Sequence, residues 1–204
     1  MKLLEDFGSA VILCGGKSIR MGFDKCNIKI NNKFLTEIIA EELAQIFTNI
    51  ILISNDVEKF KDTKYMVAED IIANAGPIGA IYTALKNTTS KYVFVTACDM
   101  PIINLNYIQY MMEIIKSENV QGVVSYNSKY IEPLYAFYSI DMIAIFETEI
   151  KKDNYKLHDV IRNSRMYYVE ENSWRKYCGG KDIFTNLNYK SDLTVLKNIF
   201  LEDS

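Results

Sequence analysis

Short apolar runs recur along the chain, each of the length expected for a buried strand. They cover residues 10–13, 50–54, 65–67, 92–96, 122–124, 130–138 and 166–169. Most of them are separated by stretches whose apolar residues follow helical spacing, at residues 35–47, 77–85, 108–115 and 142–150. Alternating strands and helices predict an α/β fold with a mostly parallel sheet and helices on both of its faces.

Local signals refine these boundaries. Pro77 is placed as the first residue of its helix, and Asn104 or Asn106 is placed to cap the helix that contains the apolar stripe. Asn32 stands in a turn, where asparagine tolerates a left-handed conformation. Residues 151–154 form a polar break. The sequence contains no repeat and no clear linker, so we predict one domain.

Glycines and cations are concentrated directly after the first apolar run. They are Gly15, Gly16 and Gly22 with Lys17, Arg20 and Lys25. A glycine-rich turn at the end of a strand exposes N–H groups that bind anionic oxygens, and the cations suit a polyphosphate. A P-loop would need glycine where Val11 stands, and a dinucleotide-binding loop would need it at Lys17. Spacing alone also allows an ordinary solvated loop.

Composition narrows the classes of function. The chain has 204 residues and a net charge of −3, which argues against a general nucleic-acid binder. No apolar run approaches the roughly 18 residues of a membrane span, so we expect no membrane contact. Four cysteines without a C-x-x-C pair, and a single histidine, make a zinc site improbable and fit a reduced cytoplasmic setting.

Polar residues follow several of the predicted strands. In an open parallel sheet, ligands bind beyond the carboxyl ends of the strands. The residues found there are Gly15, Gly16, Asn55, Asp70 and Asp99. A carboxylate at the end of a buried strand, such as Asp99, suits Mg²⁺. A turn or capping role is the alternative for Asp99 and for Asp70, and an ordinary asparagine turn is the alternative for Asn55.

The order of residues in the first loop adds a resemblance. Residues 13–25, Leu-Cys-Gly-Gly-Lys-Ser-Ile-Arg-Met-Gly-Phe-Asp-Lys, resemble the signature loop of nucleotidyltransferases that use nucleoside triphosphates, and are most similar to molybdenum cofactor guanylyltransferases. Cys98-Asp99-Met100-Pro101 resembles the metal-binding step of that family. Gly76-Pro77, residues 132–136 and residues 185–188 resemble its Gly-Pro loop, its acceptor strand and its late Asn-x-Asn step.

The resemblance implies a single Rossmann-like three-layer domain over residues 1–204. Residues 1 to about 125 would bind the nucleotide, and residues from about 126 to 204 the acceptor. It also implies transfer of GMP from GTP to molybdenum-bearing molybdopterin, with release of pyrophosphate and with Mg²⁺ on Asp99. The implied catalytic residues are Lys25, Arg20 and Asp99. The implied nucleotide-binding residues are Leu13, Cys14, Gly15, Gly16, Lys25, Asn55, Asp70, Gly76, Pro77 and Asp99, and the acceptor-binding residues are Glu132, Asn186 and Asn188.

Several points stay open at this level. His158, Arg162 and Arg165 are candidates to extend the acceptor pocket, although such residues commonly face solvent. Alternatives are a cytidylyltransferase for the same cofactor, a sugar-phosphate nucleotidyltransferase and a non-catalytic nucleotide-binding protein of the same fold. The last would be expected to lose Lys25 or Asp99, and neither is lost. We expect a monomer that contacts molybdoenzyme maturation proteins transiently.

Overall fold

The computed structural model describes residues 6–15, 25–30, 32–72, 75–127, 129–179, 182–187 and 192. The strands are β1 (Ser9–Leu13), β2 (Lys29–Ile30), β3 (Lys33–Phe34), β4 (Asn49–Ser54), β5 (Met66–Glu69), β6 (Tyr92–Ala97), β7 (Gly122–Tyr126), β8 (Ile131–Ser139) and β9 (Met166–Glu170). The helices are α2 (Leu35–Leu43), α3 (Pro77–Lys86), α4 (Leu105–Ser117), α5 (Ile143–Lys151), α6 (Leu157–Arg162) and α7 (Glu171–Trp174). Short 3₁₀ turns are η1 (Lys25–Asn27), η2 (Glu58–Phe60), η3 (Ile140–Met142) and η4 (Arg175–Tyr177).

Within these residues the main sheet has seven strands in the order β5-β4-β1-β6-β8-β7-β9. Strands β5, β4, β1 and β6 pair in parallel, and β7 pairs in parallel with β9. Only β8 runs antiparallel to its neighbours in the described sheet. The mostly parallel α/β architecture expected from the sequence is therefore confirmed.

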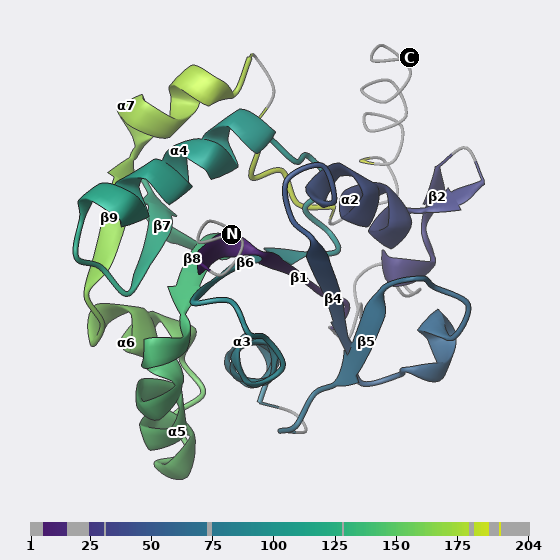
Figure 1. Cartoon of the computed structure of the whole chain (residues 1–204), viewed down its shortest axis with the longest axis horizontal. Helices are drawn as coiled ribbons and strands as arrows, with labels where there is room; N and C mark the ends of the chain where they lie inside the picture. Colours follow the sequence, from purple (N-terminus) through teal and green to yellow (C-terminus); the bar gives the residue numbers. More distant parts are fainter. Residues whose placement is uncertain are drawn as a thin grey trace.

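Helices cover both faces of the sheet, as Figure 1 shows. One hydrophobic cluster contains Leu35 and Ile39 of α2 together with Met111 of α4. The other contains Ile81 of α3 and Phe146 of α5, and it extends to α6. Each helix buries one apolar stripe against the sheet, which is the main stabilising contribution to such a layered fold.

Helix ends follow the predicted signals in two cases. Asn104 caps α4, with its Oδ1 accepting from the Tyr107 N–H at 2.9 Å. Pro77 is the first residue of α3 and follows Gly76, whose φ of +65° suits glycine.

The helix predicted over residues 35–47 ends four residues earlier, because α2 ends at Leu43. The chain leaves α2 there because the N–H groups of Thr48 and Asn49 both donate to the Gly8 carbonyl.

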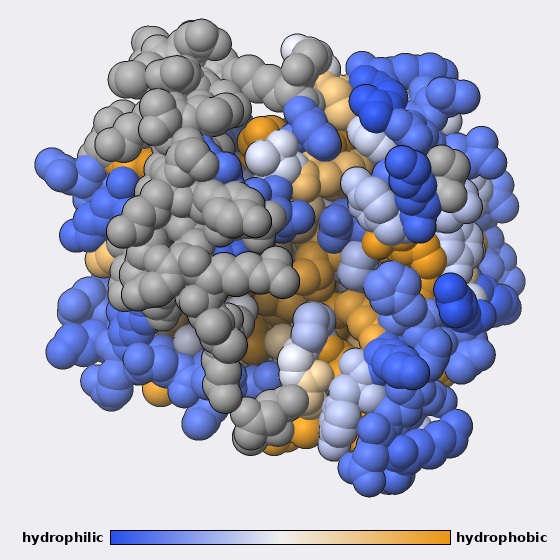
Figure 2. Space-filling view, turned by 180° about the vertical axis from the view of Figure 1, so that it is seen from behind, coloured by the Kyte–Doolittle hydropathy of each residue, from blue (hydrophilic) through white to orange (hydrophobic). Residues whose placement is uncertain are grey.

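Small elements escaped prediction. Strands β2 and β3 form a two-stranded sheet around a turn in which Asn32 has a φ of +65°, confirming the left-handed conformation expected there. Helices α6 and α7 are too short to give a clear apolar period. On the face opposite to that of Figure 1, hydrophobic residues are visible near the centre, beside a mostly hydrophilic region on the right (Figure 2). None of the described helices combines the length and apolar content needed to cross a bilayer.

Candidate active site

Four parallel strands, β1, β4, β5 and β6, end at one edge of the sheet. Leu13 at the end of β1 lies opposite Ile53 of β4 and Ala97 of β6. Two backbone bonds extend this pairing by one residue: Cys14 N donates to Ile53 O at 2.8 Å, and Cys98 N donates to Leu13 O at 3.1 Å. The chain therefore leaves β1 and β6 at the same level. Because β8 is antiparallel, its first residues lie at this edge too.

An ion pair joins two of the predicted residues at this edge. Nζ of Lys25, in η1, lies 2.7 Å from Oδ2 of Asp99, in the turn after β6. The two side chains keep 18% and 22% of their surface exposed, so the pair is half-buried and still accessible. A pair so placed can exchange its internal contact for the charges of a ligand.

Leu13, Cys14 and Gly15 are the other described residues of the first loop. Leu13 and Cys14 are buried, and Gly15 is exposed. A Cβ added to Gly15 would meet nothing within 4 Å, so internal packing does not require glycine there. Burial raises the pKa of the Cys14 thiol, with a further rise from its hydrogen bond to Cys26. Cys14 therefore stays protonated and serves as packing, not as a nucleophile. Gly16 and Arg20 lie outside the described residues.

Asn55 and Asp70 follow the two outer parallel strands. Asn55 is exposed after β4. Asp70 follows β5, and its Oδ1 accepts from Ile72 N at 3.1 Å and from the Thr83 hydroxyl at 3.0 Å. The structure thus gives Asp70 a local role in joining β5 to α3, and these bonds engage one of its two carboxylate oxygens.

The predicted Gly76-Pro77 step begins α3 close to this turn. A Cβ on the next glycine, Gly79, would lie 2.7 Å from the Ala75 Cβ and 3.1 Å from the Ile72 carbonyl oxygen. Gly79 therefore allows the start of α3 to pack tightly against the chain that follows β5. The next residue, Ala80, is half-buried.

On the acceptor side, Glu132 stands near the start of β8. Its Oε1 accepts from Leu134 N at 3.1 Å. Burial raises the pKa of the Glu132 carboxyl, and the negative charges of Asp99 and Asp182 raise it further. The start of β8, which carries Glu132, lies at the same edge of the sheet as the turn that carries Asp99.

The late Asn-x-Asn segment also meets Asp99. Leu187 N donates to the backbone oxygen of Asp99 at 2.9 Å, and the amide of the preceding Asn186 donates to Phe184 O. The structure thus brings Asn186 to the turn that carries Asp99. Asn188 lies outside the described residues.

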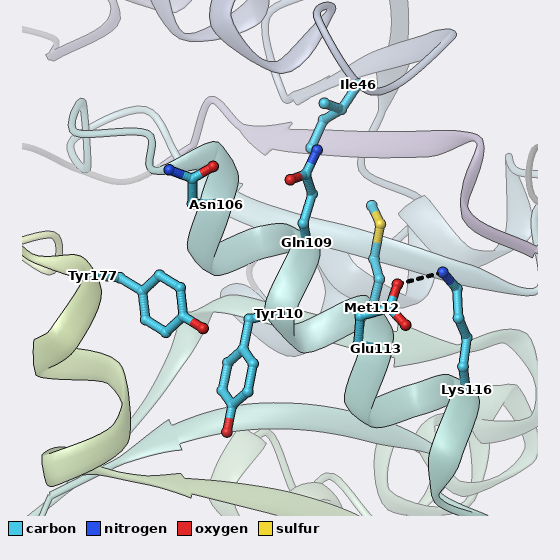
Figure 3. Close-up of a pocket in the computed structure, with 8 residues that line it drawn as sticks. All are labelled: Ile46, Asn106, Gln109, Tyr110, Met112, Glu113, Lys116 and Tyr177. Atoms are coloured by element: carbon cyan, nitrogen blue, oxygen red, sulfur yellow. Dashed lines mark hydrogen bonds and ion pairs between the residues drawn. The ribbon is translucent and has the colours of Figure 1, made fainter.

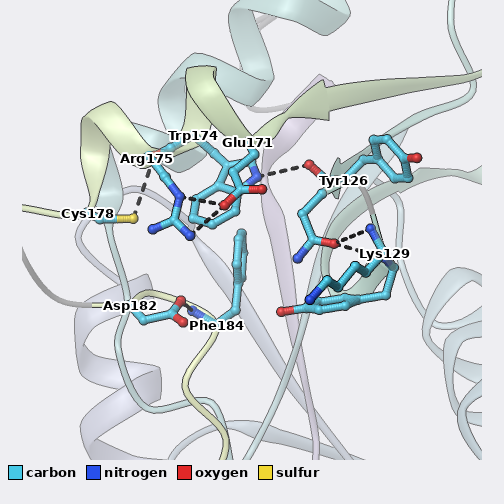
Figure 4. A network of polar contacts seen from close by, with 10 residues as sticks. Tyr126, Lys129, Glu171, Trp174, Arg175, Cys178, Asp182 and Phe184 are labelled. Carbon is cyan, nitrogen blue, oxygen red and sulfur yellow. Dashed lines mark hydrogen bonds and ion pairs between the residues drawn. The ribbon is translucent and has the colours of Figure 1, made fainter.

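Aromatic side chains support this segment (Figure 4). The rings of Trp174 and Phe184 meet edge to face with centroids 4.8 Å apart, and Phe184 meets Tyr135 in the same manner at 5.6 Å. Trp174 Nε1 donates to Tyr126 O at 3.1 Å. The end of β7, the end of α7 and the segment around Phe184 are thereby held together.

The contributions of Asp182, Trp174 and Phe184 are not predicted by any motif in the sequence. Their roles depend on contacts between segments far apart in the sequence. The positions of Cys14 and Cys98 could be predicted from the sequence, because each residue directly follows one of two strands that pair in register. The contact of Cys98 with Cys26 was not, because nothing in the sequence places η1 beside β6.

Three further candidates lie away from the edge. His158 and Arg162 are exposed on α6, and Arg165 precedes β9, so it lies at the amino edge of the sheet. Its backbone oxygen accepts from Gln121 N at 2.7 Å. The structure does not bring these residues to the acceptor side of the candidate site.

A pocket of about 530 Å³ lies elsewhere, along the outer face of α4 (Figure 3). Its lining is Ile46, Asn106, Gln109, Tyr110, Met112, Glu113, Lys116 and Tyr177. None of these is a predicted catalytic or binding residue. The candidate site is therefore defined by the sheet edge and not by this pocket.

The donor set at the edge suits one kind of metal. Among the described residues, no three histidine, cysteine, aspartate or glutamate side chains form a cluster that could hold an ion. Asp99 offers a half-buried carboxylate at this edge. Mg²⁺ is commonly held by one or two carboxylates together with water and substrate phosphates. The residues thus fit a hard cation that is shared with a phosphate ligand.

Comparisons with known proteins agree with this arrangement. A family model described as a MobA-like NTP transferase domain matches residues 10–167. A molybdenum cofactor guanylyltransferase from Syntrophotalea carbinolica is 40% identical over 186 residues, covering 91% of this chain and 89% of the relative. A probable molybdenum cofactor guanylyltransferase from Peptoclostridium acidaminophilum is 36% identical, covering 97% of this chain and 91% of the relative.

The fold has counterparts among solved structures. Molybdopterin-guanine dinucleotide biosynthesis protein A from Archaeoglobus fulgidus superimposes with a TM-score of 0.82 at 20% identity, covering 95% of this chain and 99% of the other. A CMP:2-keto-3-deoxy-manno-octonic acid synthetase reaches 0.72 at 9% identity, covering 98% of this chain and all of the other. At such identities the likeness concerns the fold alone.

Proposed function

Because this chain belongs to the family of MobA-like NTP transferases, we propose that it transfers GMP from GTP to molybdenum-bearing molybdopterin and releases pyrophosphate. The curated relatives match over most of both chains, which supports carrying over the whole reaction and not a fragment of it. The observation that carries the proposal is the ion pair of Lys25 and Asp99 at the carboxyl edge of the sheet.

The residues at this edge address the main obstacle to the reaction. Both reactants are anions, so negative charge must be neutralised before the acceptor phosphate can approach the α-phosphorus of GTP. Lys25 would turn from Asp99 toward the triphosphate and stabilise the charge that develops on the leaving pyrophosphate. We assign the same role to Arg20 on the basis of the loop motif.

No general base is required from the protein. The attacking phosphate is already ionised, so no proton has to be removed from it before the attack. The single histidine of the chain, His158, is exposed on α6, which agrees with this mechanism.

Asp99 is the residue that we propose for Mg²⁺. Its carboxylate is half-buried, and its turn is fixed by the bond from Leu187 N. When bound there, Mg²⁺ would neutralise phosphate oxygens and orient them for in-line displacement. Asp99 would be the residue that holds the cation, and Lys25 would contact the phosphates.

The guanosine would lie over Leu13, Cys14, Asn55 and Asp70. Guanine presents N1–H and N2–H donors, which need acceptors in the pocket. Since Oδ1 of Asp70 already accepts two internal bonds, guanine would be bound by its Oδ2 or by backbone carbonyls. The phosphates would follow the backbone from Gly15 and Gly16 toward Gly76 and Pro77.

The acceptor would lie on the side of Glu132, Asn186 and Asn188. We propose one domain, because strands from both halves of the chain pair in one sheet. All candidate groups belong to one chain, so a monomer would suffice, and contacts with maturation proteins would be transient. We propose that the protein acts in the cytoplasm. Its substrate would be GTP, and its four cysteines are thiols, as is usual in a reducing compartment.

Nucleotide selection tests this proposal. Purified protein is incubated with Mg²⁺, molybdenum-bearing molybdopterin and either GTP, CTP or ATP, while pyrophosphate is measured and calorimetry gives each affinity. Pyrophosphate should form with GTP, and ATP should bind roughly ten- to a hundredfold more weakly for each lost hydrogen bond. A preference for CTP would reject guanylyl transfer alone. Failure with every triphosphate would reject the whole proposal.

A further inference from the structure

Two buried cysteines neighbour the Lys25–Asp99 ion pair in the sequence. Cys26 follows Lys25 in η1, and Cys98 precedes Asp99 after β6. The Sγ of Cys26 donates to the Sγ of Cys98 at 3.2 Å. Only 2% of Cys26 and 5% of Cys98 is exposed. The two thiols thus meet across the same junction that the ion pair spans.

We propose that Cys26 and Cys98 form a reversible disulfide that ties the Lys25 turn to the Asp99 turn and lowers turnover. The bond would require little rearrangement, because an S–S length of about 2.05 Å calls for an approach of about 1.1 Å from the present 3.2 Å. The third buried thiol nearby, Cys14, donates to the Ile12 carbonyl at 3.5 Å. Cys14 also has a side-chain hydrogen bond with Cys26, but the Cys26 thiol donates to the Cys98 sulfur, so Cys98 is the partner that we propose.

The effect on the site follows from chain connectivity. A shift of about 1 Å in a catalytic group can reduce a rate by about 100-fold. Lys25 and Asp99 are each one residue from a bridged sulfur, so the bond would restrict the movement by which they separate around a ligand. The tether would thus oppose the exchange of the internal ion pair for contacts with phosphate and metal.

A peroxide is the class of oxidant that balances this step. One thiol sulfur attacks a peroxide oxygen, the O–O bond breaks, and water leaves with formation of a sulfenic acid. The second thiol attacks that sulfur, the S–S bond forms, the S–O bond breaks, and a second water leaves. Two thiols lose two electrons and two protons in total.

Peptide mapping tests the tether independently of activity. The full chain is treated with hydrogen peroxide, digested without reductant and analysed by mass spectrometry. A linked Cys26–Cys98 peptide that disappears with dithiothreitol is expected. Absence of this peptide, or a predominant link through Cys14, would overturn the proposal.

Turnover provides the second measurement, and it rests on the proposed function. Oxidation should lower pyrophosphate release by about tenfold or more, and dithiothreitol should restore it. A linked protein with unchanged turnover would reject the switch. If reduced protein transfers no GMP, the proposed function fails, and calorimetric GTP affinity before and after oxidation decides the switch instead.

Single substitutions make the result specific. Cys26→Ser should keep its basal turnover and resist peroxide, since serine preserves size and hydrogen bonding. Cys98→Ser is a second variant that removes the same link from the other side. Cys178→Ser, at the end of η4, should stay as sensitive as the wild type. Equal sensitivity of Cys26→Ser and Cys178→Ser would attribute the loss to other oxidation and overturn the proposal.

Discussion

Nζ of Lys25 lies 2.7 Å from Oδ2 of Asp99, although 74 residues separate them in the sequence. One residue belongs to η1, which follows the first loop, and the other to the turn after β6. Their contact pairs one positive and one negative charge at this edge of the sheet. It also predicts that either residue can be tested by removing its charge while the surrounding backbone stays in place.

Asp99→Asn should abolish Mg²⁺-dependent pyrophosphate release while the melting temperature changes little. The substitution keeps the shape of the side chain, and the bond from Leu187 N uses the backbone oxygen. Asp141→Asn, at an exposed carboxylate in η3 near the opposite edge, is the matched control and should retain activity. Near-normal turnover of Asp99→Asn at ordinary Mg²⁺ concentrations would remove Asp99 from the metal site.

Lys25→Ala should lower kcat by about 100-fold or more, the scale expected for one preorganised electrostatic contact. Steady-state kinetics with saturating GTP measures this. Lys33→Ala removes a comparable ion pair, with Glu41 at 2.8 Å, from a surface where the two side chains are 57% and 44% exposed. It should leave kcat unchanged. Equal kinetics for the two variants would make Lys25 an ordinary surface cation.

Glu132→Gln should stabilise the protein more at pH 8 than at pH 4. The raised pKa of folded Glu132 means that the folded state retains a proton at pH values where the unfolded state, with a pKa of about 4.3, has lost it. The stabilising contribution of this carboxyl is therefore present below the unfolded pKa and lost as pH rises through the folded one. Calorimetric melting of both proteins across this range gives the difference.

Glu149 supplies a control of opposite sign. Hydrogen bonds from Lys152 and Asn154 lower the pKa of its carboxyl. Its contribution is present above the unfolded pKa and lost as pH falls through the folded one, so Glu149→Gln should be less stable than wild type at pH 8. Parallel pH profiles for Glu132→Gln and the wild type would contradict the electrostatic assignment of Glu132.

Gly79→Ala should lower the free energy of unfolding by about 1 kcal/mol. Overpacking typically costs about 1–3 kcal/mol, and the better helix propensity of alanine returns up to about 1 kcal/mol. Urea denaturation measures the difference. Gly15→Ala adds the same methyl group where nothing lies within 4 Å, so its unfolding should change by less than about 0.5 kcal/mol. We expect Gly15→Ala to lower the affinity for GTP instead of the stability.

The sequence allowed the sheet to be predicted more completely than the site. Buried strands such as β4 and β6 are continuous apolar runs, because both of their faces are covered by other parts of the fold. Such runs can be recognised in the sequence. The positions of Gly15 and Asp99 followed from the ends of these strands. The contacts of Leu187 with Asp99 and of Cys26 with Cys98 did not, because they depend on how separate connections fold over the same edge.

The bond from Leu187 to Asp99 also has a consequence for synthesis of the chain on the ribosome. Every residue of the Lys25–Asp99 pair and of the four parallel strands emerges before the segment around Leu187. Chains fold from the N-terminus during synthesis, so a nascent chain can assemble its nucleotide side while its acceptor side is incomplete. Emergence of the segment around Leu187, and not first folding, would then be the step after which a bound triphosphate can meet its acceptor.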